Sequence, residues 1–517
     1  FDTGFETFDT GFETFDTGFE TFDTGFETGF EETDTEDTGI EICDLPPLHP
    51  RQALIETNQT ALSGITMDHL LQQAATTIDL VGDPEFTFTR IVDSYATNDQ
   101  AALAGGSHCD DELVNGEPSL NGYPLMCPRA ERFHVGQMDQ WFPIAAINRF
   151  DLTSGDGSDC GEQRVIMASN ANGRAFIIFE ARIPNPDPQC GHRGLPPDRR
   201  VLDQARRDRG SADPGRRNPY GVHGRPPGSR GAGFEPFLTG VNMTFGSGQI
   251  RTNSFDSSPW TLRQFQFVTE GDRLSVVEVP VTDNSFGPLW NDLDPHPQGP
   301  ACRAAILEGL PRLLSDNVNE MALPMPIECL SAESSDDFTS DYASMLLQGS
   351  GAFEVEIADA LAELGSDLTP LELANRATFA SNCMGCHQLA IGLDLGHGIS
   401  APSSMGFVHV DEFSTQPCSG GECFGISAAL RNQFIPHRRQ VLIDFLEFAG
   451  CDEVCEQSNP TGDVATLEGP ATIGLPEADV PVEALLAWEK ELESMGSPLT
   501  IGAGRRVVTD RARVGGQ

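Results

Sequence analysis

The run Cys383-Met384-Gly385-Cys386-His387 constrains this 517-residue chain more than any other stretch of its sequence. The chain holds 13 cysteines and 11 histidines. At those frequencies, about 0.007 Cys-x-x-Cys-His runs are expected by chance. The run therefore needs a chemical explanation.

Two thiols three residues apart can each add to one vinyl group of a single haem, and the adjacent imidazole reaches the iron from the same turn. A thioredoxin-like redox pair accounts for the cysteines but not for His387, and no βαβ pattern surrounds the run. The spacing predicts one covalently bound haem c.

The flanking sequence predicts two helices around this run. Thr369-Pro370-Leu371-Glu372 has the pattern of a capping box with proline at the first helical position, so a helix is expected from Pro370 toward Asn382. After a glycine-rich stretch, Pro436 begins an apolar helical stripe that ends at Gly450.

Helix, motif, loop and closing helix together resemble a class I monohaem cytochrome c domain over residues 368–455. "RATFASNCMGCHQ" also looks like the haem-binding helix of cytochrome c modules attached to larger exported bacterial proteins. The resemblance implies an all-α C-terminal domain, with Cys383 and Cys386 as thioether anchors and His387 as the proximal iron ligand. It further implies one-electron transfer outside the cytoplasm, and hence a redox partner protein.

The ligand on the other side of the iron is left open by the sequence. Met405 lies eighteen residues after His387, and His409 competes with it. A methionine favours a higher reduction potential and a histidine a lower one. His397 and His437 are weaker candidates, and an iron with an empty sixth position is the remaining alternative.

The other cysteines and the net charge indicate where such a protein works. Near-neighbour pairs (109 with 127, 160 with 190, 302 with 329, and two close pairs after residue 417) are typical of disulfides formed outside the cytosol. A net charge of −46 disfavours nucleic-acid binding. No stretch reaches the length of an apolar transmembrane span. We expect a periplasmic, cell-surface or secreted protein whose export is directed by residues preceding Phe1.

Composition divides the rest of the chain into four segments, one of which carries an insertion. Residues 1–44 contain four copies of "FDTGFET" and predict a disordered acidic tether. Residues 45–300 predict an α+β domain, interrupted by an Arg/Gly/Pro-rich insertion at 191–232. Residues 301–367 predict a helical connector, and 456–517 a tail with one helix.

Three local patterns support the α+β prediction. Residues 65–81 place apolar residues on one helical face. Asn172-Gly173 between "RVIMAS" and "RAFIIFEARI" predicts a hairpin, and the turn at Glu270-Gly271-Asp272 predicts a second. The sequence therefore predicts one amphipathic helix and two strand pairs in this range.

Two groups of residues could bind a metal ion other than haem iron. Acidic residues in "DLTSGDGSDCGE" could hold calcium, but their spacing does not match an EF-hand and a plain loop is the preferred interpretation (Asp151, Asp156, Asp159, Glu162). Four late cysteines could hold zinc, although their spacing is not that of a zinc knuckle (Cys418, Cys423, Cys451, Cys455).

Three functions remain from the sequence. The leading hypothesis is an exported c-type haem protein that passes electrons. The second is a haem peroxidase or oxygenase with an open sixth iron position. The third is a cell-surface binding module in which the haem is structural.

Overall fold

An antiparallel sheet forms the centre of the computed structural model, which describes residues 54–154, 158–171, 173–185, 237–243, 248–337, 340–383, 385–387, 390–418 and 420–448. The strand order is β1-β5-β6-β7-β8-β9-β10, and β11 pairs with β9 at the sheet's end. The strands are β1 (Ile55–Glu56), β5 (Trp141–Arg149), β6 (Asp159–Ser169), β7 (Ala175–Pro184), β8 (Gly248–Ser254), β9 (Thr261–Glu270), β10 (Arg273–Val279) and β11 (Ser334–Ser335).

Both predicted hairpins are present. Strands β6 and β7 pair antiparallel with Val165 opposite Phe179. Strands β9 and β10 pair with Glu270 opposite Arg273. Gly271 takes a φ of 63°, the left-handed conformation that a two-residue turn requires and that glycine adopts without steric cost.

The two faces of the sheet bury different side chains because residues alternate along each strand. Val165 and Met167 of β6 face a core formed with helices α3 (Met67–Thr76) and α4 (Pro84–Asp93). Ile166 and Ala168 point the other way, into a second core. Helix α3 confirms the amphipathic helix predicted within 65–81, and its N-cap is Thr66, whose hydroxyl accepts from the His69 N–H at 3.2 Å.

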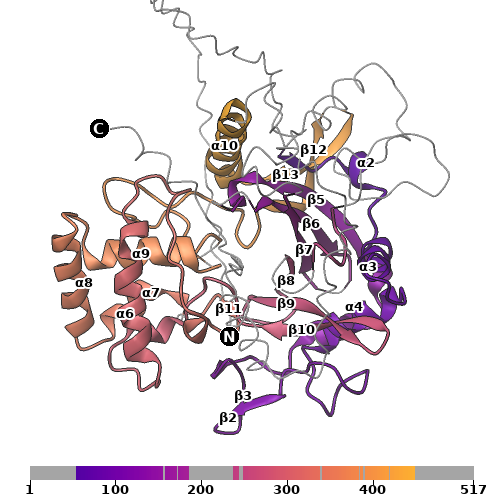
Figure 1. The fold of residues 1–517 in the computed structure, drawn as a ribbon, viewed down its shortest axis with the longest axis horizontal. Coiled ribbons are helices and arrows are strands. Elements are labelled where there is room, and N and C mark those ends of the chain that lie inside the picture. The colour runs from indigo at the N-terminus through magenta and orange to yellow at the C-terminus, as the bar shows by residue number, and fades with distance from the viewer. Residues whose placement is uncertain are drawn as a thin grey trace, which may run out of the picture. The chain divides into compact units, whose positions relative to one another are not determined.

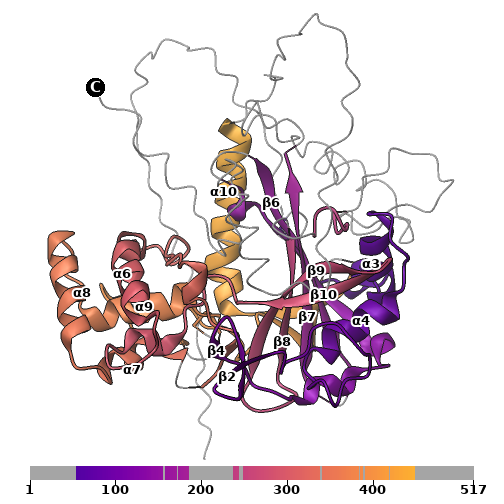
Figure 2. The same cartoon turned by 60° about the horizontal axis from the view of Figure 1, so that its bottom comes forward.

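The second core is formed with later helices: α6 (Gly299–Gly309), α7 (Tyr342–Leu347), α8 (Ala352–Glu363), α9 (Pro370–Ser381) and α10 (Ile435–Phe448). Figures 1 and 2 both show α3 and α4 on one side of the sheet and α6 to α9 on the other. Apolar residues from 54 to 442 meet in this core, so the sheet and the motif-bearing helix α9 pack as one body. Among the described residues, no helix is long and apolar enough to span a membrane.

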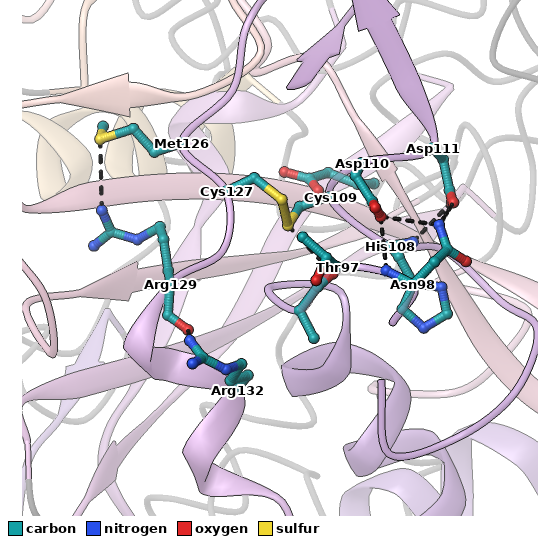
Figure 3. Close-up of a disulfide and its surroundings, with 12 residues drawn as sticks. Thr97, Asn98, His108, Cys109, Asp110, Asp111, Met126, Cys127, Arg129 and Arg132 are labelled. Carbon is teal, nitrogen blue, oxygen red and sulfur yellow. Dashed lines mark hydrogen bonds between the residues drawn. A yellow bond between two sulfur atoms is a disulfide. The ribbon is translucent and has the colours of Figure 1, made fainter. Parts of the chain in front are cut away.

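Smaller elements are fastened by disulfides. The bonds join Cys109 to Cys127, Cys302 to Cys329 and Cys418 to Cys423, three of the pairs that are neighbours in the sequence. Figure 3 shows the first of these beside the loop that precedes the small sheet β2 (Glu112–Val114), β3 (Glu117–Leu120) and β4 (Tyr123–Pro124). Because Cys418 and Cys423 are bonded to each other, they are not thiolate ligands of zinc.

The expectation of an all-α, cytochrome c-like C-terminal domain is wrong. Between α9 and α10 the chain forms the hairpin β12 (Val410–Cys418) and β13 (Gly421–Ile426). The hairpin packs beside the main sheet: the Phe424 N–H donates to the Thr57 carbonyl at 3.0 Å, next to short helix α2 (Gln59–Leu62). The region belongs to a mixed structure built on a large antiparallel sheet.

Several sequence predictions fall outside the described residues. These are the acidic repeat, the Arg/Gly/Pro-rich insertion, the cysteine pair 451 with 455, and the helix in the C-terminal tail. The pair 160 with 190 is also untested, because Cys190 lies outside the described residues and only the backbone of Cys160 is described.

Candidate functional site: a thiol and histidine cavity between α9 and the sheet

Helix α9 positions the motif, and its capping box is the one the sequence predicts. The Glu372 N–H donates to Thr369 Oγ1 at 3.2 Å, and the Thr369 N–H donates to Glu372 Oε2 at 2.7 Å. Leu373 and Ala377 are fully buried on the inner face, which fixes the rotation of the helix against the core. The helix ends at Ser381, so Cys383 follows it by two residues.

Gly385 allows the motif to fold back onto α9. Its N–H donates to the Asn382 carbonyl at 3.0 Å. A Cβ at this position would lie 1.5 Å from the Thr378 carbonyl oxygen, far inside any real contact. The glycine is therefore needed for the close approach of two backbone segments, and it sets the turn from which both thiols project.

Neither motif thiol forms a disulfide, whereas the other six cysteines with described side chains do. Burial raises the pKa of the Cys383 thiol, against a smaller lowering by the Arg251 charge. Cys383 therefore stays a protonated thiol at neutral pH. Cys383 packs against a small apolar group that contains Trp260 and Leu262.

His387 faces His409 across the same space. Their ring centres are 4.7 Å apart, and His409 Nε2 lies 3.5 Å from Cys386 Sγ. His409 Nδ1 lies 2.8 Å from Ser427 Oγ, a contact that fixes the ring. In the tautomer where Nδ1–H donates to Ser427, Nε2 presents its lone pair to the space shared with His387.

The structure separates the four candidates for the second iron ligand. His409 lines the cavity beside the motif. Met405 pairs with Val408 through its backbone N–H at 2.9 Å and packs its side chain on the main core. His397 lies between Asp316 and Asp367, at 2.9 and 2.8 Å.

The last candidate, His437, lies on α10 near Asp151. Burial lowers its pKa, outweighing the opposite effect of the Asp151 charge. Met405, His397 and His437 are all absent from the described lining of the cavity.

Aromatic rings surround the histidine pair. Trp260 lies 5.9 Å from His387 and stacks on Phe407 at 5.8 Å, between ring centres. Phe434 meets His409 edge to face at 5.6 Å. Trp260 is 1% exposed, and among the described residues nothing accepts from its indole N–H. A buried donor of this kind marks room for a further group.

The cavity has a volume of about 240 Å³ and lies against one face of the sheet. Its apolar lining comes from β5, β6, β7 and the segments after α9 (Ile147, Ile166, Phe176, Ile178, Val408, Phe434). Its ionic lining includes four arginines and two of their carboxylate partners (Arg149, Arg164, Arg251, Arg438, Asp151, Glu180). The cavity therefore combines apolar and ionic side chains.

The strand register explains this mixture. Ile166 stands opposite Ile178, which stands opposite Arg251 on β8. Two residues along, Ile147 stands opposite Arg164, which stands opposite Glu180. Each of these rows across the sheet thus holds both apolar and charged side chains.

Neighbouring arginines hold the carboxylates of Asp151 and Glu162 in the charged state. Arg149 binds Asp151 through Nε and Nη2 at 2.9 and 2.7 Å. Burial acts to raise the pKa of Asp151, but the charges of Arg149 and Arg438 outweigh it and hold the pKa well below its usual range. Glu162 follows the same pattern: burial opposes, Arg164 and Arg182 prevail, and its pKa falls to about 2.

These pairings bear on the calcium alternative. Asp151, Asp159 and Glu162 each bind an arginine side chain, and Asp156 lies outside the described residues. In the described part of the chain, no group of three or more His, Cys, Asp or Glu side chains is placed to hold a metal ion on its own.

The donor set fits a haem in its chemistry. Two thiols that form no disulfide, two imidazoles, an aromatic surround and a cavity with apolar and ionic lining suit the chemistry of a porphyrin with vinyl and carboxylate edges. His387 and His409 are the residues that would hold its iron. Their ring centres lie 4.7 Å apart, too close for a metal ion bound to both rings, so the two rings would have to move apart.

Sequence reasoning found the thiols and both histidines but missed Ser427, Trp260 and the arginines. Three of the four arginines stand on strands of the sheet, Arg149 on β5, Arg164 on β6 and Arg251 on β8, whereas Arg438 lies on α10. Comparisons with family models, with curated proteins and with solved structures give no match.

Proposed function

We propose that this chain is a c-type haem protein, with one haem attached to Cys383 and Cys386, and that it transfers single electrons. The observation that supports the proposal is that Cys383 and Cys386 line one cavity with His387 and His409 and form no disulfide, in a chain whose other described cysteine side chains are disulfide-bonded.

Each residue has a task in this proposal. Cys383 and Cys386 anchor the porphyrin edge, and His387 binds the iron from the motif side. His409 is the second ligand, oriented by Ser427 at 2.8 Å. Trp260 and Phe434 exclude water from the histidine pair. When bound, the haem supplies a one-electron iron couple.

Two nitrogen ligands favour electron transfer over catalysis, because a six-coordinate iron has no open position for peroxide or oxygen. They also favour a low reduction potential relative to a methionine-ligated iron. The disulfides support an oxidising compartment as the place of work, such as the periplasm or cell surface, and the redox partner is then another protein there.

The peroxidase or oxygenase alternative rests on the same histidine. If His409 moves away from the His387 ring without binding iron, its Nε2 would act as a distal base beside an open position.

Optical spectroscopy of the haem-loaded protein distinguishes these functions. We expect low-spin iron that cycles reversibly and does not bind carbon monoxide. His409→Ala should convert it to high-spin, carbon-monoxide-binding iron, while Met405→Ala and the control His397→Ala should leave the spectrum unchanged. A wild-type spectrum that is high-spin and responds to carbon monoxide would favour the enzyme. A low-spin haem that no soluble donor reduces would favour the structural role.

A further inference from the structure

Arg251 is the charged side chain of the ionic cavity lining with the fewest hydrogen bonds. It lines the cavity from β8, and its side chain is 12% exposed. Its one charged contact within the described residues is Nε to Glu180 Oε2 at 3.5 Å, too long for a hydrogen bond. A guanidinium carries five donors, so a buried one with no hydrogen bond is costly.

Glu180 does not form a hydrogen bond with Arg251. The Gln249 side-chain amide donates to Glu180 Oε2, whereas Arg164 lies 3.1 Å from Oε1 but donates its hydrogen bonds to Glu162. The Glu180 side chain is fully buried, and among the described residues nothing donates to its Oε1. The guanidinium of Arg251 therefore lines the cavity without a hydrogen-bonded carboxylate.

A neighbouring acceptor lines the same cavity. Asn253, two residues along β8 on the same face, is 5% exposed. Within the described residues its Oδ1 has no donor, while its amide donates to the Phe407 carbonyl at 3.4 Å. An acidic group of a ligand can therefore meet Arg251, while Asn253 Oδ1 can accept only from a donor elsewhere on that ligand.

We propose that Arg251 is the anchor of a carboxylate-binding subsite in this cavity. A carboxylate accepts two parallel N–H bonds from a guanidinium and supplies a hydrogen-bonded counter-charge that Glu180 does not. Arg438 and Arg149, which share Asp151, line the same cavity and add positive potential. The ligand is a molecule with an apolar body and a carboxylate that binds Arg251.

Two sources can provide that carboxylate. One is the propionate edge of the covalently bound porphyrin, in which case the inference rests on the proposed function. The other is a free organic acid that enters the cavity. The chemistry at Arg251 is the same in both cases, and the experiment distinguishes the sources.

The first measurement is the haem content of the purified full chain, which tests the proposed function separately. On the haem-loaded protein, the midpoint potential is then followed against pH. A propionate paired with Arg251 gives an inflection, and Arg251→Gln should raise its pH by about one unit or more. The same substitution lowers the potential, because a positive charge near the iron is lost.

The second arm titrates the protein, with or without haem, with succinate and benzoate at constant ionic strength. Saturable binding that Arg251→Gln weakens by about tenfold or more identifies a free carboxylate. Arg251→Lys keeps the charge but not the fork, so it should retain the potential and lose part of the affinity. Arg273→Gln, a half-exposed arginine on β10 that does not line the cavity, is the matched control.

Circular dichroism and thermal unfolding establish that each variant is folded before it is compared. An Arg251-dependent inflection supports the propionate, and Arg251-dependent titration supports the free acid. If folded Arg251→Gln and Arg251→Lys match the wild type and Arg273→Gln in both arms, the subsite does not exist.

Discussion

Gly385→Ala should be far more damaging than a surface glycine substitution, because the motif turn rests directly on α9. The added Cβ would lie 1.5 Å from the Thr378 oxygen and 2.3 Å from the carbonyl carbon, whereas real Cβ contacts essentially never fall below 3.0 Å. The two backbone segments must therefore separate by about 1.5 Å. Overpacking that moves buried backbone costs roughly 3 kcal/mol or more.

The effect should appear in both stability and haem content. The free energy of unfolding is measured by urea titration, and haem by the ratio of porphyrin absorbance to protein. Gly299→Ala is the control, since its Cβ would meet only the mobile end of Arg303 at 3.1 Å. The reasoning is refuted if Gly385→Ala is as stable as Gly299→Ala and carries as much haem.

Two further predictions concern Asp151 in the ionic cavity lining and the disulfide between Cys302 and Cys329. Asp151 has a lowered pKa in the folded protein, so its stabilisation is present above the unfolded pKa of about 3.9 and is lost as pH falls below it. Asp151→Asn should reduce the loss of unfolding free energy at acid pH. It should also lower the unfolding free energy at pH 7 by about 3 kcal/mol, because Arg149 and Arg438 lose their partner. An unchanged dependence of the unfolding free energy on acid pH would contradict this. Replacing both Cys302 and Cys329 by serine opens a crosslink of 27 residues and should lower the unfolding free energy by about 3.5 kcal/mol relative to the oxidised wild type, measured by urea titration. Equal stability of the oxidised wild type and the variant would contradict this.

Local signals in the sequence predict local structure well here. The capping box at Thr369 and Glu372, the turn at Gly271 and the helix within 65–81 are set by contacts between residues close in sequence. The physical causes act within a few residues, so the pattern and the structure agree.

The hairpin β12–β13 shows where such reasoning fails. The sequence indicates only a glycine-rich stretch here, between the two helices of a cytochrome-like domain. In the structure, β12 continues the alternation of Val408 and Val410, and Cys418 and Cys423 close the turn that contains Gly420. The hairpin is stabilised by packing on β5 and by Thr57, residues more than 250 positions away, which no local pattern records.

The candidate site was predictable in part for the same reason. Cys383, Cys386 and His387 are one contiguous motif, and His409 was among the candidates for the second ligand. Arg251 reaches the site through the register of β8 against β7 and Arg438 through the packing of α10. These placements depend on the tertiary fold.

Covalent haem attachment tests the central claim most directly. The full chain is produced in a bacterium whose periplasmic haem-ligation machinery is active, denatured, and extracted with acidified organic solvent. We predict that one haem per chain stays with the polypeptide, that Cys383→Ala and Cys386→Ala together abolish it, and that Cys418→Ala with Cys423→Ala does not. Pigment that leaves entirely with the solvent, or a wild-type chain without haem, would contradict the claim.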